Sequence, residues 1–319
     1  MRNPLMPFCC LLLLAFFVAP NRTLLAGPTT ETAVLPVWSE IFARPKDPLV
    51  DLPAPADNPF SEAKAKLGKA LFFDTRLSSD SVRACASCHD HERGFTDGLK
   101  RAAARDGKTE LANSPSLLNL AWSKQLFWDG RAKSLEDQAW QPIENRQEMA
   151  GEWPTIVGEL STDNDMAKLF RAAFGVDAVI SKATVTQALA TYVRTLVSPA
   201  GRFDRFIDGD VQALSVSERA GFLLFVGKGG CAGCHWGWRF TDDRMHLTGI
   251  GDVPIKTPGL RQVSNTAPYM HDGSKTTLKD VITHYTSFTG DRTLSANLVR
   301  PLSLNSQEIR DLIAFLKAL

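Results

Sequence analysis

The chain lacks the marks of a nucleic-acid-binding or membrane-spanning protein. Its 319 residues carry a formal net charge of +1 and contain no basic run, which argues against a nucleic-acid partner. After the N-terminal region, no segment approaches the roughly 20 consecutive apolar residues of a transmembrane helix. No sustained alternation of apolar and polar residues indicates a β-sheet. What remains is a globular composition, 44% hydrophobic and 22% charged, in a chain long enough for two domains.

The N-terminus predicts export. Arg2 precedes the apolar run LMPFCCLLLLAFFVAP, and TLLAG ends in small residues, so we interpret residues 1–26 as a signal peptide cleaved near Ala26. A retained membrane anchor is the alternative, but the apolar run is short for a span. Export places the mature protein in the periplasm, without a membrane span, and removes Cys9 and Cys10.

The remaining cysteines all lie in C-x-x-C-H patterns. CASCH comprises Cys85, Cys88 and His89, and CAGCH comprises Cys231, Cys234 and His235. In such a motif both thiols form thioethers with the haem vinyl groups, and the adjacent histidine reaches the iron. A Cys₄ zinc site, a thioredoxin-like pair and plain disulfides are the alternatives, and none explains a histidine after both pairs. The sequence therefore predicts two covalently bound haem c groups.

Several segments show the apolar spacing of amphipathic helices. From Val185 to Leu196 and from Ile309 to Leu316, apolar side chains recur every three or four positions. Asn305 is expected to cap the second of these helices, and Ser215 with Glu218 forms a capping-box pattern before RAGFLLF.

The surroundings of the two haem motifs repeat. LGKALFF precedes the first and AGFLLFV the second, while RGFTD and RFTD follow them, which indicates a diverged duplication of one haem-binding unit. We therefore expect a mainly α-helical protein with few or no strands. Two cytochrome c-like haem domains, residues 61–205 and 206–319, would pack around a shared interface. Residues 27–60, rich in proline, would form an irregular N-terminal arm.

Three further motifs carry a specific resemblance. LFWDGRAKSLEDQAWQPIENRQEM (residues 126–149), NSPSLLN (113–119) and NTAPYMHDGSKTTLKDV (265–281) resemble the bacterial di-haem cytochrome c peroxidase family. The resemblance extends from about Ala63 to the end of the chain. It implies a shared fold, two haems and a reaction with hydrogen peroxide.

The resemblance also implies catalytic roles around the first haem. Trp128 would lie between the haems and relay electrons, whereas its residue type alone would favour a core position. Glu148 would move a proton between the peroxide oxygens as a general acid–base, although alone it reads as a surface charge. Gln138 would donate a hydrogen bond and Pro142 would shape the wall of the pocket.

The first haem iron is expected to have an open face. Resting peroxidases of the family carry a blocking histidine in the loop after the first haem motif, but here residues 98–112 contain neither histidine nor methionine. His91 lies too close to His89 to reach the opposite face. Lys100 or Lys108 as ligand is the alternative.

Other residues are assigned by the same resemblance. Asn113 would bind a calcium ion through its side chain, and Thr266 and Pro268 through their carbonyl groups, an oxygen set that suits Ca²⁺; on sequence alone these motifs are turn signals. His271 matches a position near the second haem. His246 has no assigned role and is expected to be a surface or hydrogen-bonded core histidine.

The second iron is expected to take Tyr285 as its axial ligand. Leu278, Ile282 and Tyr285 share the apolar face of a helix, whereas His284 falls on the polar, surface side. Tyr285 also stands where peroxidases of this family carry an axial methionine. A buried tyrosine with an ordinary hydrogen bond is the alternative.

These predictions lead to two enzymatic interpretations. By the same resemblance, a tyrosine ligand implies that peroxide, or O₂ plus electrons, forms a high-valent di-haem state that oxidises tryptophans of a partner. The implied partner is a precursor of methylamine dehydrogenase, whose tryptophan tryptophylquinone cofactor would be completed. The alternative is a peroxidase that takes electrons from a small cytochrome c or a cupredoxin; a pure electron carrier, with both irons fully ligated, is a third class. In relatives with a tyrosine ligand, a tryptophan two residues before the second haem motif carries the oxidation to the protein surface. Here that position is Gly229, and Trp236 and Trp238 are the possible substitutes.

Overall fold

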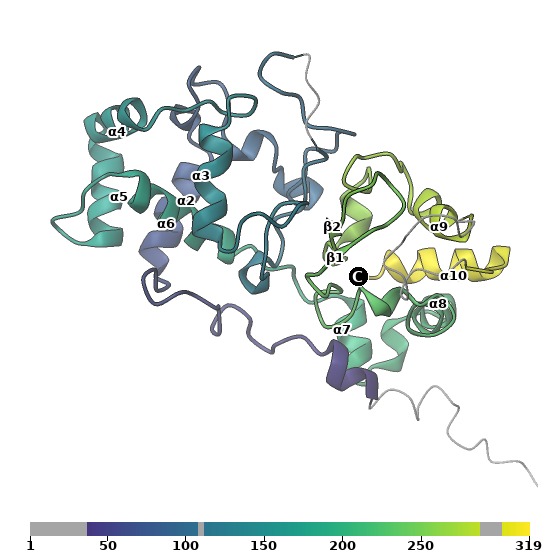
Figure 1. The fold of residues 1–319 in the computed structure, drawn as a ribbon. Helices are drawn as coiled ribbons and strands as arrows, with labels where there is room; N and C mark the ends of the chain where they lie inside the picture. Colours follow the sequence, from purple (N-terminus) through teal and green to yellow (C-terminus); the bar gives the residue numbers. More distant parts are fainter. Residues whose placement is uncertain (1–36, 108–111, 288–301) are drawn as a thin grey trace, which may run out of the picture.

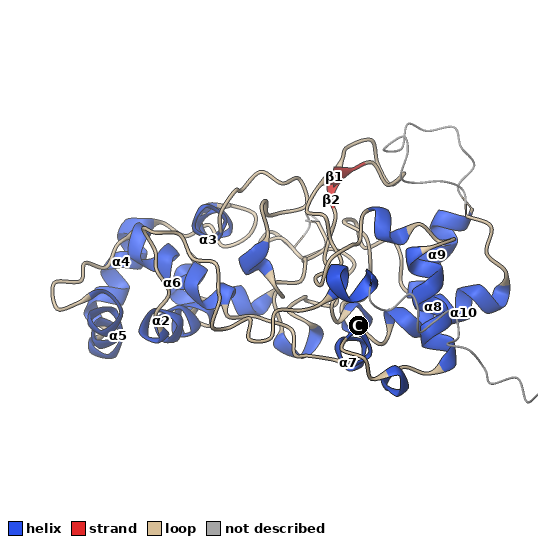
Figure 2. Cartoon of the chain, turned by 90° about the horizontal axis from the view of Figure 1, so that it is seen from below, coloured by secondary structure: helices blue, strands red, loops and turns tan. Residues whose placement is uncertain are grey.

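The computed structural model describes residues 37–107, 112–287 and 302–319. Figure 1 shows two groups of helices joined by irregular chain, and the perpendicular view in Figure 2 shows the same division. The helices of the first group are α2 (Glu62–Phe72), α3 (Leu135–Glu144), α4 (Trp153–Thr162), α5 (Asn164–Phe174) and α6 (Lys182–Arg194). Those of the second are α7 (Arg202–Ile207), α8 (Val216–Val226), α9 (Leu278–Thr286) and α10 (Ser306–Leu316). The expected mainly α-helical class is confirmed.

Short elements connect these helices. Within the described part of the chain, the strands are β1 (Met245–His246) and β2 (Ile255–Lys256), which pair antiparallel. The 3₁₀ turns are η1 (Thr75–Leu77), η2 (Cys85–Ser87), η3 (His91–Arg93), η4 (Leu120–Trp122), η5 (Val211–Ala213), η6 (Cys231–Gly233) and η7 (Val263–Asn265). The cysteine motifs thus begin on η2 and η6. No helix among the described residues is long and apolar enough to cross a bilayer.

The first core forms where α2 crosses α6. A Cβ atom on Gly68 would lie 1.9 Å from the Ala188 carbonyl oxygen, so only glycine permits this close approach of the two backbones. Leu67, Leu71 and Leu189 are buried around the crossing. The periodicity that predicted a helix near residues 185–196 therefore marks the face of α6 that packs on α2.

The second core repeats this crossing with α8 and α10. A Cβ atom on Gly221 would lie 2.0 Å from the Asp311 carbonyl oxygen. The predicted caps are confirmed: the Ser215 side chain accepts from the Glu218 backbone N–H to begin α8, and Asn305 caps α10. Two glycine-mediated crossings at equivalent places support the predicted duplication.

The N-terminal arm departs from the expected irregular structure. Residues 37–42 are helical, and Phe42 is buried in the second core, with its ring centroid 6.0 Å from that of Phe203 and 5.8 Å from that of Phe222. In Figure 1 this segment lies beside α7, and the chain then runs back to α2. The expected boundary after residue 205 falls inside α7, whose apolar side chains belong to the second core. Residues 1–36, including the predicted signal peptide, lie outside the described chain.

A second repeat appears between residues 119–142 and 262–285. Isolated antiparallel bridges pair Leu126 with Ala132 and Tyr269 with Lys275. Each segment also starts with a left-handed residue and leads into a side-chain-capped helix, α3 or α9. When the two segments are aligned on these bridges, Trp128 and His271 occupy equivalent positions, and so do Pro142 and Tyr285. The duplication therefore extends beyond the haem motifs themselves.

Candidate haem sites

The histidines of the two haem motifs are held in the same way. The Nδ1 atom of His89 donates to the Phe95 carbonyl oxygen at 2.9 Å, and that of His235 donates to the Phe240 carbonyl oxygen at 2.9 Å. Both phenylalanines adopt left-handed backbone angles, with φ of 62° and 57°, which turn these carbonyls toward the rings. Burial lowers the pKa of both imidazoles. Each ring is therefore neutral, fixed in orientation, and has Nε2 available for a metal.

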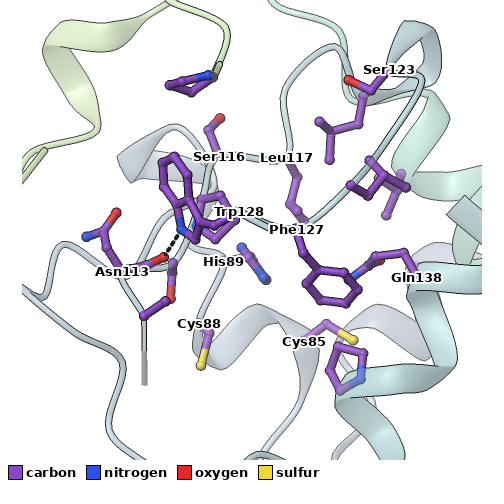
Figure 3. A pocket seen from close by; sticks show the side chains of 18 of the residues that line it. Cys85, Cys88, His89, Asn113, Ser116, Leu117, Ser123, Phe127, Trp128 and Gln138 are labelled. Atoms are coloured by element: carbon purple, nitrogen blue, oxygen red, sulfur yellow. Dashed lines mark hydrogen bonds between the residues drawn. The ribbon is translucent and has the colours of Figure 1, made fainter. Parts of the chain in front are cut away.

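The first cavity has a volume of about 470 Å³. It brings together the first haem motif and the predicted catalytic residues, although they are distant in sequence; its lining includes Cys85, Cys88, His89, Trp128, Gln138, Pro142 and Glu148. Figure 3 shows the cysteines and His89 facing the same space as Trp128 and Gln138. The structure thus assembles all the residues predicted for the peroxide-reactive haem around one cavity.

The second cavity has a volume of about 550 Å³. Its lining includes Cys231, Cys234, His235, His271 and Tyr285. Tyr285 comes from α9, Cys231 from η6, Cys234 and His235 from the chain directly after η6, and His271 from the chain between η7 and α9. The predicted axial tyrosine therefore shares one cavity with the second haem motif.

Both cavities fit a covalently bound haem. Their volumes lie within the roughly 300–1,000 Å³ typical of cofactor pockets. Burial raises the pKa of Cys85 and of Cys231 to about 12, the opposite of the lowered value that marks a thioredoxin-like thiol. Two protonated thiols beside a neutral histidine match thioether attachment and axial ligation, so the zinc and redox-pair alternatives fit poorly.

Comparison of the sequence with known protein families and proteins shows its family. A family described as di-haem cytochrome c peroxidase matches residues 62–212, and one described as cytochrome c matches residues 219–319. The methylamine utilization protein MauG of Methylophilus methylotrophus is 40% identical, over 93% of this chain and 92% of that protein. This chain belongs to the di-haem cytochrome c peroxidase family. It therefore holds two haem c groups and is an oxidoreductase.

Other members of the family are also similar. A cytochrome-c peroxidase of Pseudomonas sp. strain SCT is 33% identical over 86% of this chain and 85% of its own length. The crystal structure of a MauG-like protein associated with microbial copper homeostasis superposes with a TM-score of 0.77 at 30% identity, covering 83% of this chain and 91% of that one. Both the MauG and the peroxidase branches of the family thus contain relatives of this chain.

Glu148 lies on the side of the first cavity formed by α3 and the turn after it. Its Oε1 atom accepts a hydrogen bond of 2.6 Å from the Asn145 side chain, and burial raises the pKa of its carboxyl group. A carboxyl group with a raised pKa, fixed by an amide, can accept and return a proton near neutral pH. Asn145 was not predicted, although its place three residues before Glu148 in a turn is a usable signal.

The described part of the loop after the first haem motif contributes Ala102, Ala103 and Ala112 to the lining of the first cavity, and none of these side chains can bind iron. The His91 side chain is 70% exposed, and Lys100 is exposed. Neither lines the first cavity, and Lys108 lies outside the described residues. Met149, which the sequence analysis did not consider, does line the cavity, but its side chain packs in the first core.

Tyr285 and His284 occupy different environments. Burial, together with the nearby Cys231 and Cys234 thiols, raises the pKa of the Tyr285 phenol. Without a cation beside it the side chain is therefore a neutral phenol, and ionisation to the phenolate would need a charge such as that of ferric iron. His284 is half-buried, and its Nε2 atom hydrogen-bonds to the Thr248 carbonyl oxygen at 2.8 Å. It does not line the second cavity. It is also partly buried, which differs from the exposed position that was expected.

Trp128 lies between the cavities and lines both. Its Nε1 atom donates to the Asn113 carbonyl oxygen at 2.7 Å (Figure 3), and its ring meets that of His271 edge-on, with centroids 6.4 Å apart. The backbone of His271 is itself bonded to Asn113, through the Asn113 N–H. The bridging tryptophan is therefore fixed by contacts with both halves of the molecule.

The residues predicted to bind calcium surround the same junction. Asn113 is buried and lines both cavities, and Thr266 and Pro268 line the second. The Asn113 amide nitrogen donates to the Leu99 carbonyl oxygen at 2.9 Å, which leaves the side-chain oxygen as the atom able to face a cation.

Two further predictions concern residues near the second motif. His246 is a buried, hydrogen-bonded histidine, because its Nε2 atom lies 2.7 Å from an Asp242 carboxylate oxygen. Trp236 is 51% exposed, whereas Trp238 meets the Trp122 ring edge-on at 4.9 Å. Of these two tryptophans, Trp236 is therefore the exposed one, and it follows His235 directly.

Proposed function

We propose that the protein is a periplasmic di-haem enzyme that uses hydrogen peroxide, or O₂ plus electrons, to oxidise tryptophans of a partner protein. The proposed partner is a precursor of methylamine dehydrogenase, and the proposed product is its tryptophan tryptophylquinone cofactor. The observation that carries this proposal is the place of Tyr285 in the second haem cavity. The 40% identity to a methylamine utilization protein supports the same assignment.

The chemistry divides between the cofactor and the chain. Bound haem supplies the iron that cleaves peroxide and holds the oxidising equivalents. Glu148 accepts the proton of the incoming peroxide and returns it to the departing oxygen, while Gln138 donates a hydrogen bond. Pro142 contributes no side-chain atom that could bind iron, so at this position the first cavity would leave room for peroxide.

Tyr285 and Trp128 give the second haem its role. A phenolate is a hard anionic ligand that lowers the reduction potential of iron, whereas methionine raises it and suits electron donation. Tyr285 therefore favours the retention of oxidising equivalents over their rapid reduction by a carrier. Trp128, fixed between the cavities, provides an oxidisable side chain through which the haems share electrons.

Two further assignments belong to this proposal. Asn113, Thr266 and Pro268 hold one Ca²⁺ beside Trp128, because their oxygen atoms are neutral and hard. Trp236 is the exit for long-range oxidation, since it follows His235 directly and half of its surface is exposed. Gly229 carries no side chain that could take this role.

The second candidate is a peroxidase that takes electrons from a small cytochrome c or a cupredoxin. It is favoured by the relative named as a cytochrome-c peroxidase and by the glycine at position 229. It differs from the first candidate in its reductant. If peroxide oxidises a reduced cytochrome c or cupredoxin in steady state, this alternative is supported. If neither donor is oxidised, the result argues against it.

The experiment that tests the proposal uses the di-haem protein and purified precursor dehydrogenase. Addition of peroxide is expected to produce quinone absorbance, and Tyr285→Phe is expected to abolish it while changing the spectrum of one haem. His284→Gln is the matched control, because the neighbouring side chain lies outside the cavity; it is expected to keep both properties. Absence of quinone with the wild-type protein contradicts the substrate, and an unchanged Tyr285→Phe spectrum contradicts the ligand.

A further inference from the structure

One buried charge lies where the two haem cavities meet. Nine described residues line both cavities: Asn113, Ser114, Pro115, Ser116, Trp128, Ile255, Lys256, Pro258 and Gly259. Among them Lys256 alone carries a charge. The residue is only 9% exposed, so its ammonium group faces the junction of the cavities rather than bulk solvent.

Lys256 has weak partners for a buried ammonium group. Its Nζ atom lies 3.4 Å from the carbonyl oxygen of the adjacent Thr257 and 3.9 Å from Asp243 Oδ1. Asp243 is already engaged, since Arg239 donates to its other oxygen at 2.5 Å. An ammonium group has three N–H donors, and a buried charge is costly unless it is paired. The site therefore has capacity for a further anionic acceptor.

The charge balance of the second cavity points the same way. Its described lining contains Lys228 and Lys256 but no aspartate or glutamate. Lys228 is half-exposed and bonded to Glu308 at 2.6 Å, whereas burial lowers the pKa of Lys256, with Asp243 opposing the shift. The second cavity therefore offers one under-compensated positive charge, and it lies on the side shared with the first.

The backbone fixes this charge beside the bridging indole. Lys256 belongs to β2, and its N–H donates to the Trp128 carbonyl oxygen at 2.8 Å. The strand pairing with β1 sets the register, with Met245 opposite Lys256. The ammonium group and the indole thus start from two chain segments that are hydrogen-bonded to each other.

We infer that the Lys256 ammonium group binds propionate carboxylates of the two haems where the cavities meet, and that its charge raises the reduction potential of both. A positive charge in a low-dielectric site favours the ferrous state, which carries one positive charge less than the ferric state. Lys256 thereby shifts both potentials in the same direction, whereas Trp128 provides the path for electrons between the two haems. The inference rests on the presence of two haems and not on the identity of the oxidised partner.

The test compares three variants of the di-haem protein by spectroelectrochemical titration. In Lys256→Met the ferrous-to-ferric ratio at a fixed potential is expected to fall at least tenfold for both haems, which is a shift of 59 mV for a one-electron couple. Lys256→Arg retains the positive charge, so the midpoint potentials of both haems are expected to shift less than in Lys256→Met. Lys228→Met is the control, because it removes an exposed charge that is paired with Glu308. Solvent screens this charge, so the ferrous-to-ferric ratio is expected to change less than threefold.

The outcomes are distinguishable. In one outcome, Lys256→Met leaves the ferrous-to-ferric ratio of both haems at the fixed potential within threefold of the wild-type value. Lys256 is then only a structural partner of Asp243, whether or not the variant is less stable, and the inference is wrong. Should that variant not assemble, Lys256→Arg carries the test through resonance Raman spectra: the propionate bending bands are expected to shift, and unchanged bands overturn the inference. Both readouts use resting protein without peroxide or partner, so they do not depend on the proposed function.

Discussion

Pro142 and Tyr285 occupy equivalent positions in the two halves of the molecule. Each lies on the helix that follows an isolated β-bridge and a side-chain cap, α3 for Pro142 and α9 for Tyr285. Each also lines the haem cavity of its own half. The duplicated unit thus places a proline in the wall of the first cavity where the second has a phenol, and of these two side chains only the phenol has an atom that could bind iron. In the function proposed above, this pair distinguishes the peroxide-reactive haem from the tyrosine-ligated one.

The equivalence predicts the effect of Pro142→Tyr. The new phenol is expected to bind the first iron as we propose for Tyr285, since α3 repeats the geometry of α9. Both haems would then be six-coordinate, and the rate of reaction with peroxide is expected to fall at least tenfold. Electronic spectra and stopped-flow mixing with peroxide measure the two effects.

Pro142→Ala separates ligation from the loss of proline. Alanine cannot bind iron, so this variant is expected to keep an open first haem. If the alanine and tyrosine variants show the same spectrum, the phenol does not reach the iron and the equivalence does not extend to the side chains.

Trp128→Phe tests electron sharing between the haems. Phenylalanine keeps most of the apolar contact but is harder to oxidise and loses the hydrogen bond to Asn113, which contributes about 1 kcal/mol. Peroxide is still expected to react at the first haem, whereas the accompanying spectral change at the second haem slows at least tenfold. Rapid-scan absorbance after stoichiometric peroxide resolves the two phases.

The matched control for this substitution is Trp122→Phe. Trp122 contacts Trp238 edge-on but lies outside the described lining of either cavity. It is expected to leave both phases unchanged. Equal slowing in the two variants would indicate a general loss of packing rather than a relay through Trp128.

The crossing of α8 and α10 predicts a stability effect at Gly221. An alanine methyl group would lie 2.0 Å from the Asp311 carbonyl oxygen, so Gly221→Ala must separate the helices and is expected to lower the free energy of unfolding by about 1–3 kcal/mol. Gly158→Ala is the control, because its Cβ atom meets nothing within 4 Å in α4. That variant is expected to gain up to about 1 kcal/mol from helix propensity. Urea unfolding followed by circular dichroism compares them.

Local patterns were sufficient to predict much of the fold. The periodicity of α6 and α10 and the Ser215 cap are direct consequences of helical geometry, so they appear in the chain itself. The close approach at Gly68 could not be predicted, because it depends on which backbone crosses above it. The position of Phe42 in the second core was missed for the same reason, since a proline-rich segment gives no indication of where it docks.

The site shows the same limit. The haem motifs are contiguous, and their chemistry follows from residue type and spacing alone. Glu148 and Trp128 were located through resemblance to a family, because single side chains carry no local signal of a shared cavity. Tyr285 was also indicated by its place on the apolar face of its helix. Lys256 was missed, since only the folded chain shows that its charge lies between two cavities.

The environment of Glu148 predicts a pH dependence. Burial raises the pKa of this carboxyl group above the ordinary value of about 4.3, and the group must be ionised to accept the peroxide proton. The rate of reaction with peroxide is therefore expected to fall as the pH decreases through this raised pKa. Glu148→Gln is expected to lose about 10²-fold in rate, and with it this pH dependence. Glu144→Gln is the control, because Glu144, also on α3, is bonded to Lys182, which lowers its pKa. A pH profile unchanged in Glu148→Gln would show that another group moves the proton.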